Sequence, residues 1–230
     1  MTLSAVLFDV DFTLARPGPE LGPDGYVRVG RLHGLDLAPE RYEEARLQAI
    51  DALQRHPDHR HDEEIWVEFT ERVVRGMGGD AERAHEAAVE IAGAWERSEN
   101  FDLYDDVLPV LDELRRQGLK IGLVSNGVRD LEEFVRHHRL DVDAAVGSRA
   151  HGRVKPSPTI FHAALQQLGV EPPDAVMVGD SPLDDIEGAR AIGMRAFLVD
   201  RDDRYPEIPD RLPDLRALPA ALGVPSSSDG

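Results

Sequence analysis

The sequence predicts an α/β protein with a doubly wound, Rossmann-like parallel sheet and an inserted α-helical domain. Short runs that are almost entirely apolar recur along the chain, as in strands buried on both faces of a parallel sheet. Helical patterns separate these runs, which favours right-handed βαβ units. One long segment near the amino terminus breaks the alternation, because it contains helical patterns and no convincing strand.

The expected strands and helices alternate along most of the chain. The first strand is expected over residues 3–8, and the later strands over 120–124, 144–146, 175–178 and 196–199. The expected helices are 107–117, 128–139, 158–168 and 183–192, several with a glycine just past the end. Reactive groups of such sheets lie at the carboxyl ends of the strands, so the residues that follow each strand are the candidates for a site.

The segment from residue 16 to residue 100 is expected to be an inserted helical domain. It opens with the loop sequence RPGPELGPDG and continues with three helical patterns. Two of these have apolar stripes typical of a helical bundle core: Ile65, Trp66, Phe69, Val73 and Val74, then Ala84, Ala87, Ala88, Ile91 and Trp95. The predicted organisation is therefore a core of residues 1–15 and 101–222, an insert of 16–100 and a flexible tail of 223–230.

Composition and charge narrow the classes of function. The 230 residues include 44 acidic side chains and 26 Lys and Arg, and the formal net charge of −18 would repel a nucleic-acid backbone. Cysteine is absent, which excludes disulfides, thiolate metal sites and cysteine nucleophiles. No cationic segment precedes the first apolar run, which breaks at Asp9, so we expect neither a signal peptide nor a membrane span, and a cytoplasmic location. The sequence predicts no oligomeric state.

Three carboxylates follow two of the expected strands. Asp9 and Asp11 come directly after the first strand, and Asp180 follows the strand at 175–178. Crowded carboxylates are costly unless a cation is bound, and a hard divalent ion such as Mg²⁺ takes oxygen ligands. The sequence therefore indicates a Mg²⁺ site, although the Asp9 and Asp11 pair alone has an equally good structural interpretation.

Groups suited to a phosphoryl ligand follow other strands. Ser125 and Asn126 are small hydrogen-bonding residues that could hold phosphoryl oxygens, although such a pair is more often an N-cap and turn. Lys155 could offset the charge of a bound phosphate. Asp184 or Asp185 could support the metal ligands from behind, or could cap the helix that follows.

Four motifs in this order resemble those of the haloacid dehalogenase-like hydrolase superfamily. They read DVDFT from Asp9, SN from Ser125, KPSP from Lys155 and GDSPLDD from Gly179. The resemblance covers about residues 3–199, and the helical insert matches the position of the superfamily's small α-helical cap. The chain is most similar to the phosphatase branch with such a cap, which includes phosphoglycolate phosphatase-like and nucleotidase-like members.

The resemblance implies a Mg²⁺-dependent phosphatase that hydrolyses small-metabolite phosphate monoesters through an aspartyl-phosphate. Asp9 would be the nucleophile and Asp11 the acid and then the base, and a carboxylate pair can perform this chemistry. The implied metal ligands are Asp9, the backbone carbonyl of Asp11, and Asp180. The implied substrate-binding residues are Thr13, Ser125, Asn126 and Lys155, of which Lys155 is also catalytic, and Asp184 and Asp185 would support the site.

Phe12 departs from the family pattern, because glycine is commoner between the second aspartate and the threonine. Phe12 could form an apolar wall that biases the leaving group. Other residues that could contact a substrate or a transition metal lie mostly in the insert: Arg16, Tyr26, Arg28, Arg31, His33 and Arg129 for a substrate, and His56, His59 and His61 for a metal. Each of these is more often a surface residue.

Several alternatives remain open from the sequence. Dehalogenases of the superfamily typically lack an aspartate at the position of Asp11, which favours phosphate chemistry here. A phosphomutase would use the same residues and differ in how water is excluded. Outside the enzymes, a phosphoacceptor or binding module of the receiver type would also place aspartates and a lysine at a sheet edge, but such domains are far shorter.

Overall fold

The computed structural model describes residues 3–53 and 59–223. The chain divides into two compact units, which we call the core and the insert. The core consists of Met1–Arg16, Leu103–Gly127 and Leu131–Gly230, and the insert of Pro17–Asp102 and Val128–Asp130. The tail predicted at residues 223–230 lies almost wholly outside the described residues.

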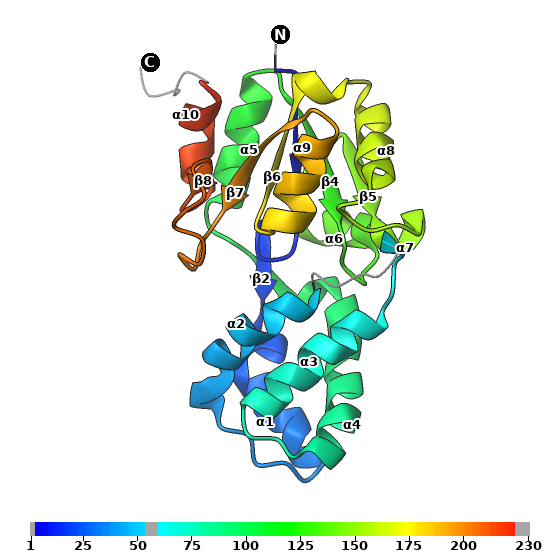
Figure 1. Ribbon diagram of the computed structural model, residues 1–230, viewed down its shortest axis with the longest axis vertical. Helices are drawn as coiled ribbons and strands as arrows, with labels where there is room; N and C mark the ends of the chain where they lie inside the picture. The colour runs from blue at the N-terminus through cyan, green and yellow to red at the C-terminus, as the bar shows by residue number, and fades with distance from the viewer. Residues whose placement is uncertain (1–2, 54–58, 224–230) are drawn as a thin grey trace. The chain divides into compact units, whose positions relative to one another are not determined.

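The core contains a six-stranded sheet in which every neighbouring pair is parallel (Figure 1). Its strands are β1 (Ala5–Phe8), β4 (Lys120–Ser125), β5 (Ala144–Gly147), β6 (Ala175–Gly179), β7 (Arg195–Val199) and β8 (Arg211–Leu212), in the order β5-β4-β1-β6-β7-β8. Phe8 lies opposite Leu123 on one side and Val178 on the other. The chain segments that follow β1, β4 and β6 therefore leave the sheet at the same edge. The predicted doubly wound parallel sheet is confirmed.

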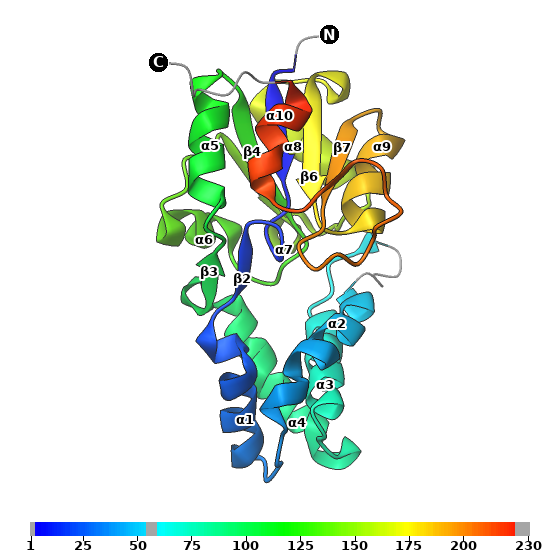
Figure 2. The same cartoon turned by 90° about the vertical axis from the view of Figure 1, so that its left-hand side faces the viewer.

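Helices cover both faces of this sheet (Figures 1 and 2). The helices of the core are α5 (Val107–Arg116), α6 (Leu131–His138), α7 (Ser148–His151), α8 (Pro158–Leu168), α9 (Gly188–Ala191) and α10 (Leu218–Leu222). Figure 2 shows α5 and α10 on one face and α8 on the other. Ile160 and Phe161 of α8 belong to one buried apolar cluster with Leu7 of β1 and Met177 of β6. Burial of these side chains is the main force that holds α8 to the sheet.

Two core helices differ from the sequence prediction. The helix expected over 128–139 begins at Leu131, because residues 128 and 129 form a bend and are not helical. The helix expected over 183–192 is a π-helical turn, Pro182–Glu187, followed by α9. The turn is wide because the Ser181 carbonyl accepts hydrogen bonds from the amides of both Asp185 (3.1 Å) and Ile186 (3.3 Å). Such turns are frequent at functional sites.

The insert contains four α-helices in its described part, whereas three helical patterns were predicted. They are α1 (Pro23–Leu32), α2 (Tyr42–Leu53), α3 (Glu64–Gly76) and α4 (Ala81–Ala92). The helix α1 begins at Pro23, inside the segment that was predicted as a loop, because Gly25 and Gly30 lower its helix propensity. Gly25 is needed by packing, since a Cβ there would lie 1.9 Å from the Glu20 carbonyl oxygen. Two strands were also missed at the ends of the insert, because β2 (Ala15–Pro17) and β3 (Phe101–Leu103) are too short to show alternation.

Aromatic side chains form the centre of the insert. The rings of Trp66 and Trp95 lie 4.8 Å apart between centroids, and Phe69 and Phe101 lie 5.4 Å and 5.5 Å from Trp95. Every residue of the two predicted apolar stripes is buried, which confirms their interpretation as a bundle core. No helix in the described parts of the chain is long and apolar enough to cross a membrane.

Candidate active site

The loop after β1 presents Asp9 and Asp11 at the carboxyl edge of the sheet. The Asp9 amide continues the strand pairing by donating to the Val178 carbonyl at 2.9 Å. A tight turn follows, in which the Leu14 amide donates to the Val10 carbonyl at 2.9 Å. Phe12 has a φ of 63° within this turn, in the left-handed region that favours glycine. The Phe12 backbone thus adopts a conformation that glycine would adopt without strain.

Lys155 lies between two buried carboxylates. Its ammonium donates to Oδ1 of Asp9 and, at 2.7 Å, to Oδ1 of Asp185. Only 2% of the Lys155 side chain and 1% of the Asp185 side chain are exposed. Burial alone would lower the pKa of Lys155, but the charges of Asp185 and Asp9 outweigh it and raise the pKa. Lys155 is therefore a permanent cation in the site.

Asn126 holds the main chain of Lys155 in place. Its Oδ1 accepts from the Lys155 amide at 2.7 Å, and its Nδ2 donates to the Lys155 carbonyl at 3.1 Å and to Asp184 Oδ2 at 3.3 Å. Ser125 is buried, and its Oγ accepts from the Gly127 amide at 3.0 Å. The Asn126 side chain is therefore occupied in positioning Lys155, and a substrate contact from this residue would have to come from its backbone.

The segment after β6 brings Asp184 and Asp185 into the site. Oδ2 of Asp185 accepts from the Ser181 amide at 3.0 Å, while Oγ of Ser181 accepts from the Asp184 amide at 3.1 Å. Asp185 lies inside this turn, where one of its oxygens accepts from the backbone of the N-cap residue Ser181 and the other contacts Lys155. Gly179 makes room for it, because a Cβ there would lie 2.2 Å from the Asp185 carboxyl carbon.

Asp180 completes a group of three carboxylates. Oxygens of Asp9, Asp180 and Asp185 all lie within 4.8 Å of one another, the one such group among the described residues. Thr13 is wholly buried, and its hydroxyl donates to Asp180 Oδ1 at 3.2 Å. Asp11, which is also buried, is not one of the three. The fold thus brings all the sequence-predicted site residues to one edge of the sheet.

Three carboxylates of this site, those of Asp9, Asp180 and Asp184, resist ionisation. Burial, followed by the charges of Asp185 and Asp11, raises the pKa of Asp9 to about 7 despite the opposing effect of Lys155. Burial and the charges of Asp9 and Asp185 raise the pKa of Asp180, and burial with Asp185 raises that of Asp184. A divalent cation would remove this repulsion, and clustered carboxylate oxygens are the donors that Mg²⁺ prefers. The residues present therefore fit a Mg²⁺ ion.

The other sequence candidates lie elsewhere. Tyr26 is wholly buried in the insert, so it does not present its hydroxyl to a substrate. Arg129 packs in the insert with its guanidinium 3.6 Å from the Phe101 ring centroid. Nε2 of His61 lies 3.9 Å from Oε1 of Glu63, and His59 is exposed. Neither histidine belongs to a metal-binding group in the described ranges. His56 lies outside the described residues.

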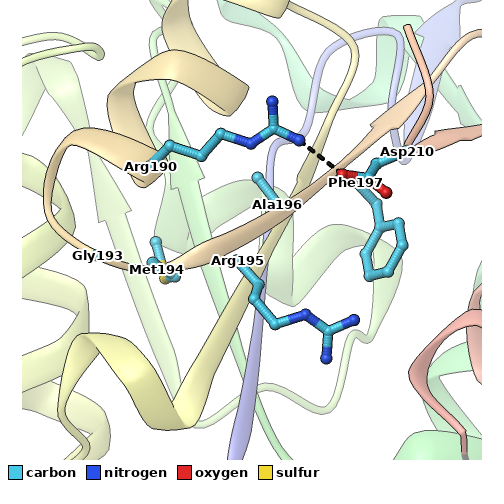
Figure 3. Close-up of a pocket in the computed structure, with 7 residues that line it drawn as sticks. All are labelled: Arg190, Gly193, Met194, Arg195, Ala196, Phe197 and Asp210. Carbon is cyan, nitrogen blue, oxygen red and sulfur yellow. Dashed lines mark hydrogen bonds and ion pairs between the residues drawn. The ribbon is translucent and has the colours of Figure 1, made fainter.

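A separate pocket of about 320 Å³ lies at the start of β7 (Figure 3). Its lining residues are Arg190, Gly193, Met194, Arg195, Ala196, Phe197 and Asp210. Figure 3 shows the ion pair between Arg190 and Asp210, which measures 2.8 Å. None of these residues belongs to the carboxylate site, which lies at the opposite, carboxyl end of the strands.

The family model described as haloacid dehalogenase-like hydrolase matches residues 3–193. The chain belongs to this family. This haloacid dehalogenase-like hydrolase is therefore an enzyme, and the resemblance predicted from the four motifs is confirmed.

Three relatives illustrate what the hydrolase is similar to. Phosphoserine phosphatase from Thermus thermophilus is 41% identical over 155 residues, which cover 64% of this chain and 61%, less than two thirds, of that protein. Glyceraldehyde 3-phosphate phosphatase from Methanopyrus kandleri is 34% identical over 226 residues, 92% of this chain and 91% of that protein. The crystal structure of a HAD phosphatase from Thermococcus onnurineus aligns with a TM-score of 0.64 and 28% identity, covering 96% of this chain and 98% of that one.

Proposed function

We propose that this hydrolase is a Mg²⁺-dependent phosphatase that acts on small phosphorylated metabolites through an aspartyl-phosphate on Asp9. The observation that carries the proposal is the grouping of Asp9, Asp180 and Asp185 within 4.8 Å beside the buried ammonium of Lys155. Asp9 and Asp180 suit a hard cation while Asp185 pairs with Lys155, and a cation together with a lysine suits a dianionic phosphate. Two relatives that are named as phosphatases add support.

Asp11 favours phosphate-ester hydrolysis over dehalogenation. An alkoxide leaving group needs a proton, whereas a halide does not. Asp11 follows Asp9 by two residues and is buried at the same edge of the sheet, which supports its proposed role as the acid beside the proposed nucleophile. A dehalogenase would have no use for it.

In the first step, a carboxylate oxygen of Asp9 attacks phosphorus. The bond between phosphorus and the ester oxygen breaks, and Asp11 gives its proton to the leaving oxygen, which departs as an alcohol. The Lys155 ammonium compensates negative charge on Asp9 and on the phosphoryl oxygens. Asp9 must be ionised to attack, and a bound Mg²⁺ supplies the positive charge that lowers its pKa from about 7.

In the second step, water attacks the phosphorus of the aspartyl-phosphate. Asp11, now a carboxylate, takes a proton from this water, and the bond between phosphorus and the Asp9 oxygen breaks. The products are inorganic phosphate, the Asp9 carboxylate and a protonated Asp11, so the site returns to its starting state.

The remaining site residues are proposed to bind or position. The proposed metal ligands are Asp9, Asp180 and the backbone carbonyl of Asp11. Ser125, the backbone of Asn126 and Lys155 are proposed to hold the phosphoryl group, and Asp184 and Asp185 to support Asn126 and Lys155, which they contact. Thr13 donates to Asp180, which supports a role in fixing that ligand; a contact from Thr13 to substrate stays a prediction.

The predicted inserted domain of residues 16–100 is proposed to be a cap that admits only small metabolites to the site. A cap of this size would exclude a folded protein substrate. The location is proposed to be cytoplasmic.

The test is release of inorganic phosphate from a panel of phosphate monoesters that includes phosphoserine, phosphoglycolate, sugar phosphates and nucleoside monophosphates. We expect turnover with Mg²⁺, none with EDTA, and none for Asp9→Asn. The control is Asp112→Asn, which changes an exposed carboxylate on α5 and should leave turnover within twofold of wild type. Absence of turnover on every ester would contradict the proposal and favour a phosphomutase or a binding protein.

A further inference from the structure

The turn after β7 is held rigidly at the carboxyl edge of the sheet. Asp200 accepts hydrogen bonds from the amides of Arg204 (2.8 Å) and Tyr205 (2.9 Å), and from Arg211 Nη1 (3.0 Å). These bonds lower the pKa of Asp200 although its burial opposes them, so its carboxylate stays ionised and the turn stays closed at neutral pH. The backbone of the next residue, Arg201, is therefore held in a fixed position.

The Arg201 guanidinium makes three hydrogen bonds. Nη1 and Nη2 each donate to one oxygen of Asp106 at 3.0 Å, and Nη2 also donates to the Thr13 carbonyl at 2.9 Å. The guanidinium carbon lies 3.8 Å from the centroid of the Tyr104 ring. Asp106 is 1% exposed and also accepts from the Leu215 amide at 2.8 Å. This fork is thus built from four segments that are distant in the sequence.

Thr13 connects this fork to the carboxylate group. Arg201 holds its carbonyl, and its own hydroxyl donates to Asp180 Oδ1 at 3.2 Å. Thr13 is wholly buried, so its backbone and side chain have little freedom apart from these bonds. A displacement of the Thr13 backbone would therefore move the hydroxyl that orients Asp180.

We propose that Arg201 is a positioning residue for Asp180 that acts through Thr13. Arg201 has no hydrogen bond to the three carboxylates in the described structure, so it is not a catalytic residue. The inference rests on the proposed function in one respect, since it takes Asp180 as a ligand of Mg²⁺. No sequence pattern indicates this role, because Arg201 opens a polar, proline-rich segment that lacks any motif.

The geometry requires arginine at this position. A guanidinium is planar and can donate in parallel to both oxygens of a carboxylate while one nitrogen serves a further acceptor. A lysine ammonium keeps the charge but cannot chelate Asp106 and reach the Thr13 carbonyl in the same fixed geometry. The variant Arg201→Lys therefore removes the positioning and preserves the charge.

The test measures Mg²⁺ affinity by titration calorimetry on the full chain, without substrate. Loss of a residue that orients a metal ligand typically weakens metal binding about tenfold or more, and we expect this for Arg201→Lys. The control is Arg190→Lys, which changes an exposed arginine that is also paired with an aspartate (Figure 3). We expect less than a twofold change for this control.

A double-mutant cycle tests the route through Thr13. The variant Thr13→Val removes the hydroxyl and should itself weaken Mg²⁺ binding. In that background Arg201→Lys should have less than a twofold further effect, because the group through which it acts is gone. Independent, additive effects would overturn the proposed route.

The outcomes separate this inference from the proposed function. A wild type that does not bind Mg²⁺ at all would overturn the proposed function. A wild type that binds Mg²⁺, with Arg201→Lys binding equally tightly, would overturn the inference alone. If Arg201→Lys does not fold, as judged by circular dichroism, Asp106→Asn replaces it, because it opens the same fork and should give the same loss of affinity.

Discussion

The Lys155 ammonium donates a 2.7 Å hydrogen bond to Asp185, and the two side chains are 2% and 1% exposed. The same ammonium also contacts Asp9. A buried ion pair is tolerated only where each charge keeps a partner, so Lys155 and the two carboxylates depend on one another. This dependence leads to the first prediction.

Replacing Lys155 by methionine should destabilise the metal-free protein by about 3 to 5 kcal/mol at pH 8, because two buried carboxylates lose their cation. The loss should shrink at pH 5, where Asp9 can be protonated. Urea unfolding at both pH values measures this. The control is Lys120→Met, which removes an ammonium that donates to the neutral Leu168 carbonyl and should cost about 1 kcal/mol. Equal costs for the two variants at pH 8 would contradict the account.

The stability of the metal-free protein should fall as the pH rises from about 4 to 7. The pKa of Asp9 is raised from 3.8 to about 7 in the folded state, so the folded chain keeps a proton there that the unfolded chain loses. Stability is therefore greatest below the unfolded pKa and is lost as the pH rises through the folded one. Asp180 and Asp184 shift in the same direction.

This pH dependence should flatten in Asp9→Asn, which has no proton to lose at that position. It should also flatten when saturating Mg²⁺ is added to the wild type, because a bound cation removes the repulsion. Thermal unfolding in buffers between pH 4 and pH 8 measures the slope. A slope that is the same in Asp9→Asn and in wild type would show that another group is responsible.

Gly179→Ala should disrupt the site. The added Cβ would lie 2.2 Å from the Asp185 carboxyl carbon, so Asp185 must leave both Lys155 and the Ser181 amide. We expect loss of several kcal/mol of stability and a fall in kcat of about 100-fold or more, since displacing a positioned group by about 1 Å can cost that much. Gly93→Ala, where no atom lies within 4 Å of the added Cβ, is the control and should change neither quantity measurably.

Phe12→Gly tests whether this side chain biases the leaving group. Glycine adopts the observed φ of 63° without strain, so the variant should fold. If Phe12 forms an apolar wall, the ratio of kcat/KM values for apolar and polar esters should fall in the variant. An unchanged ratio across the ester panel would refute the hypothesis.

Strong local patterns allowed most of the sheet to be predicted. The apolar runs at β1, β4, β6 and β7 are typical of strands buried on both faces, and their carboxyl ends carry the polar motifs. Elements without such a pattern were missed. The two residues of β8 are too few for any periodicity, and the start of α1, which contains a glycine that packing requires, was predicted as a loop.

The residue types of the site could be read from the sequence, but several of their contacts could not. The sequence left Asp185 with two interpretations, support of the metal ligands and capping; in the fold one of its oxygens accepts from the Ser181 amide and the other from Lys155. A substrate contact from Asn126 stays a prediction, and no sequence pattern indicated that its side chain would hold the Lys155 main chain. The contact of Arg201 with Thr13 joins residues 188 positions apart, so no local pattern could have indicated it.

Asp9 is proposed to carry the phosphoryl group during turnover. The most direct test of this proposal is acid quench of the enzyme during turnover of its best ester, followed by mass spectrometry of the peptide that contains Asp9. We expect a transient phosphoryl adduct on Asp9 that forms before phosphate is released and is absent in Asp9→Asn. Phosphate release in the first turnover with no adduct on Asp9 at any quench time would contradict the proposal.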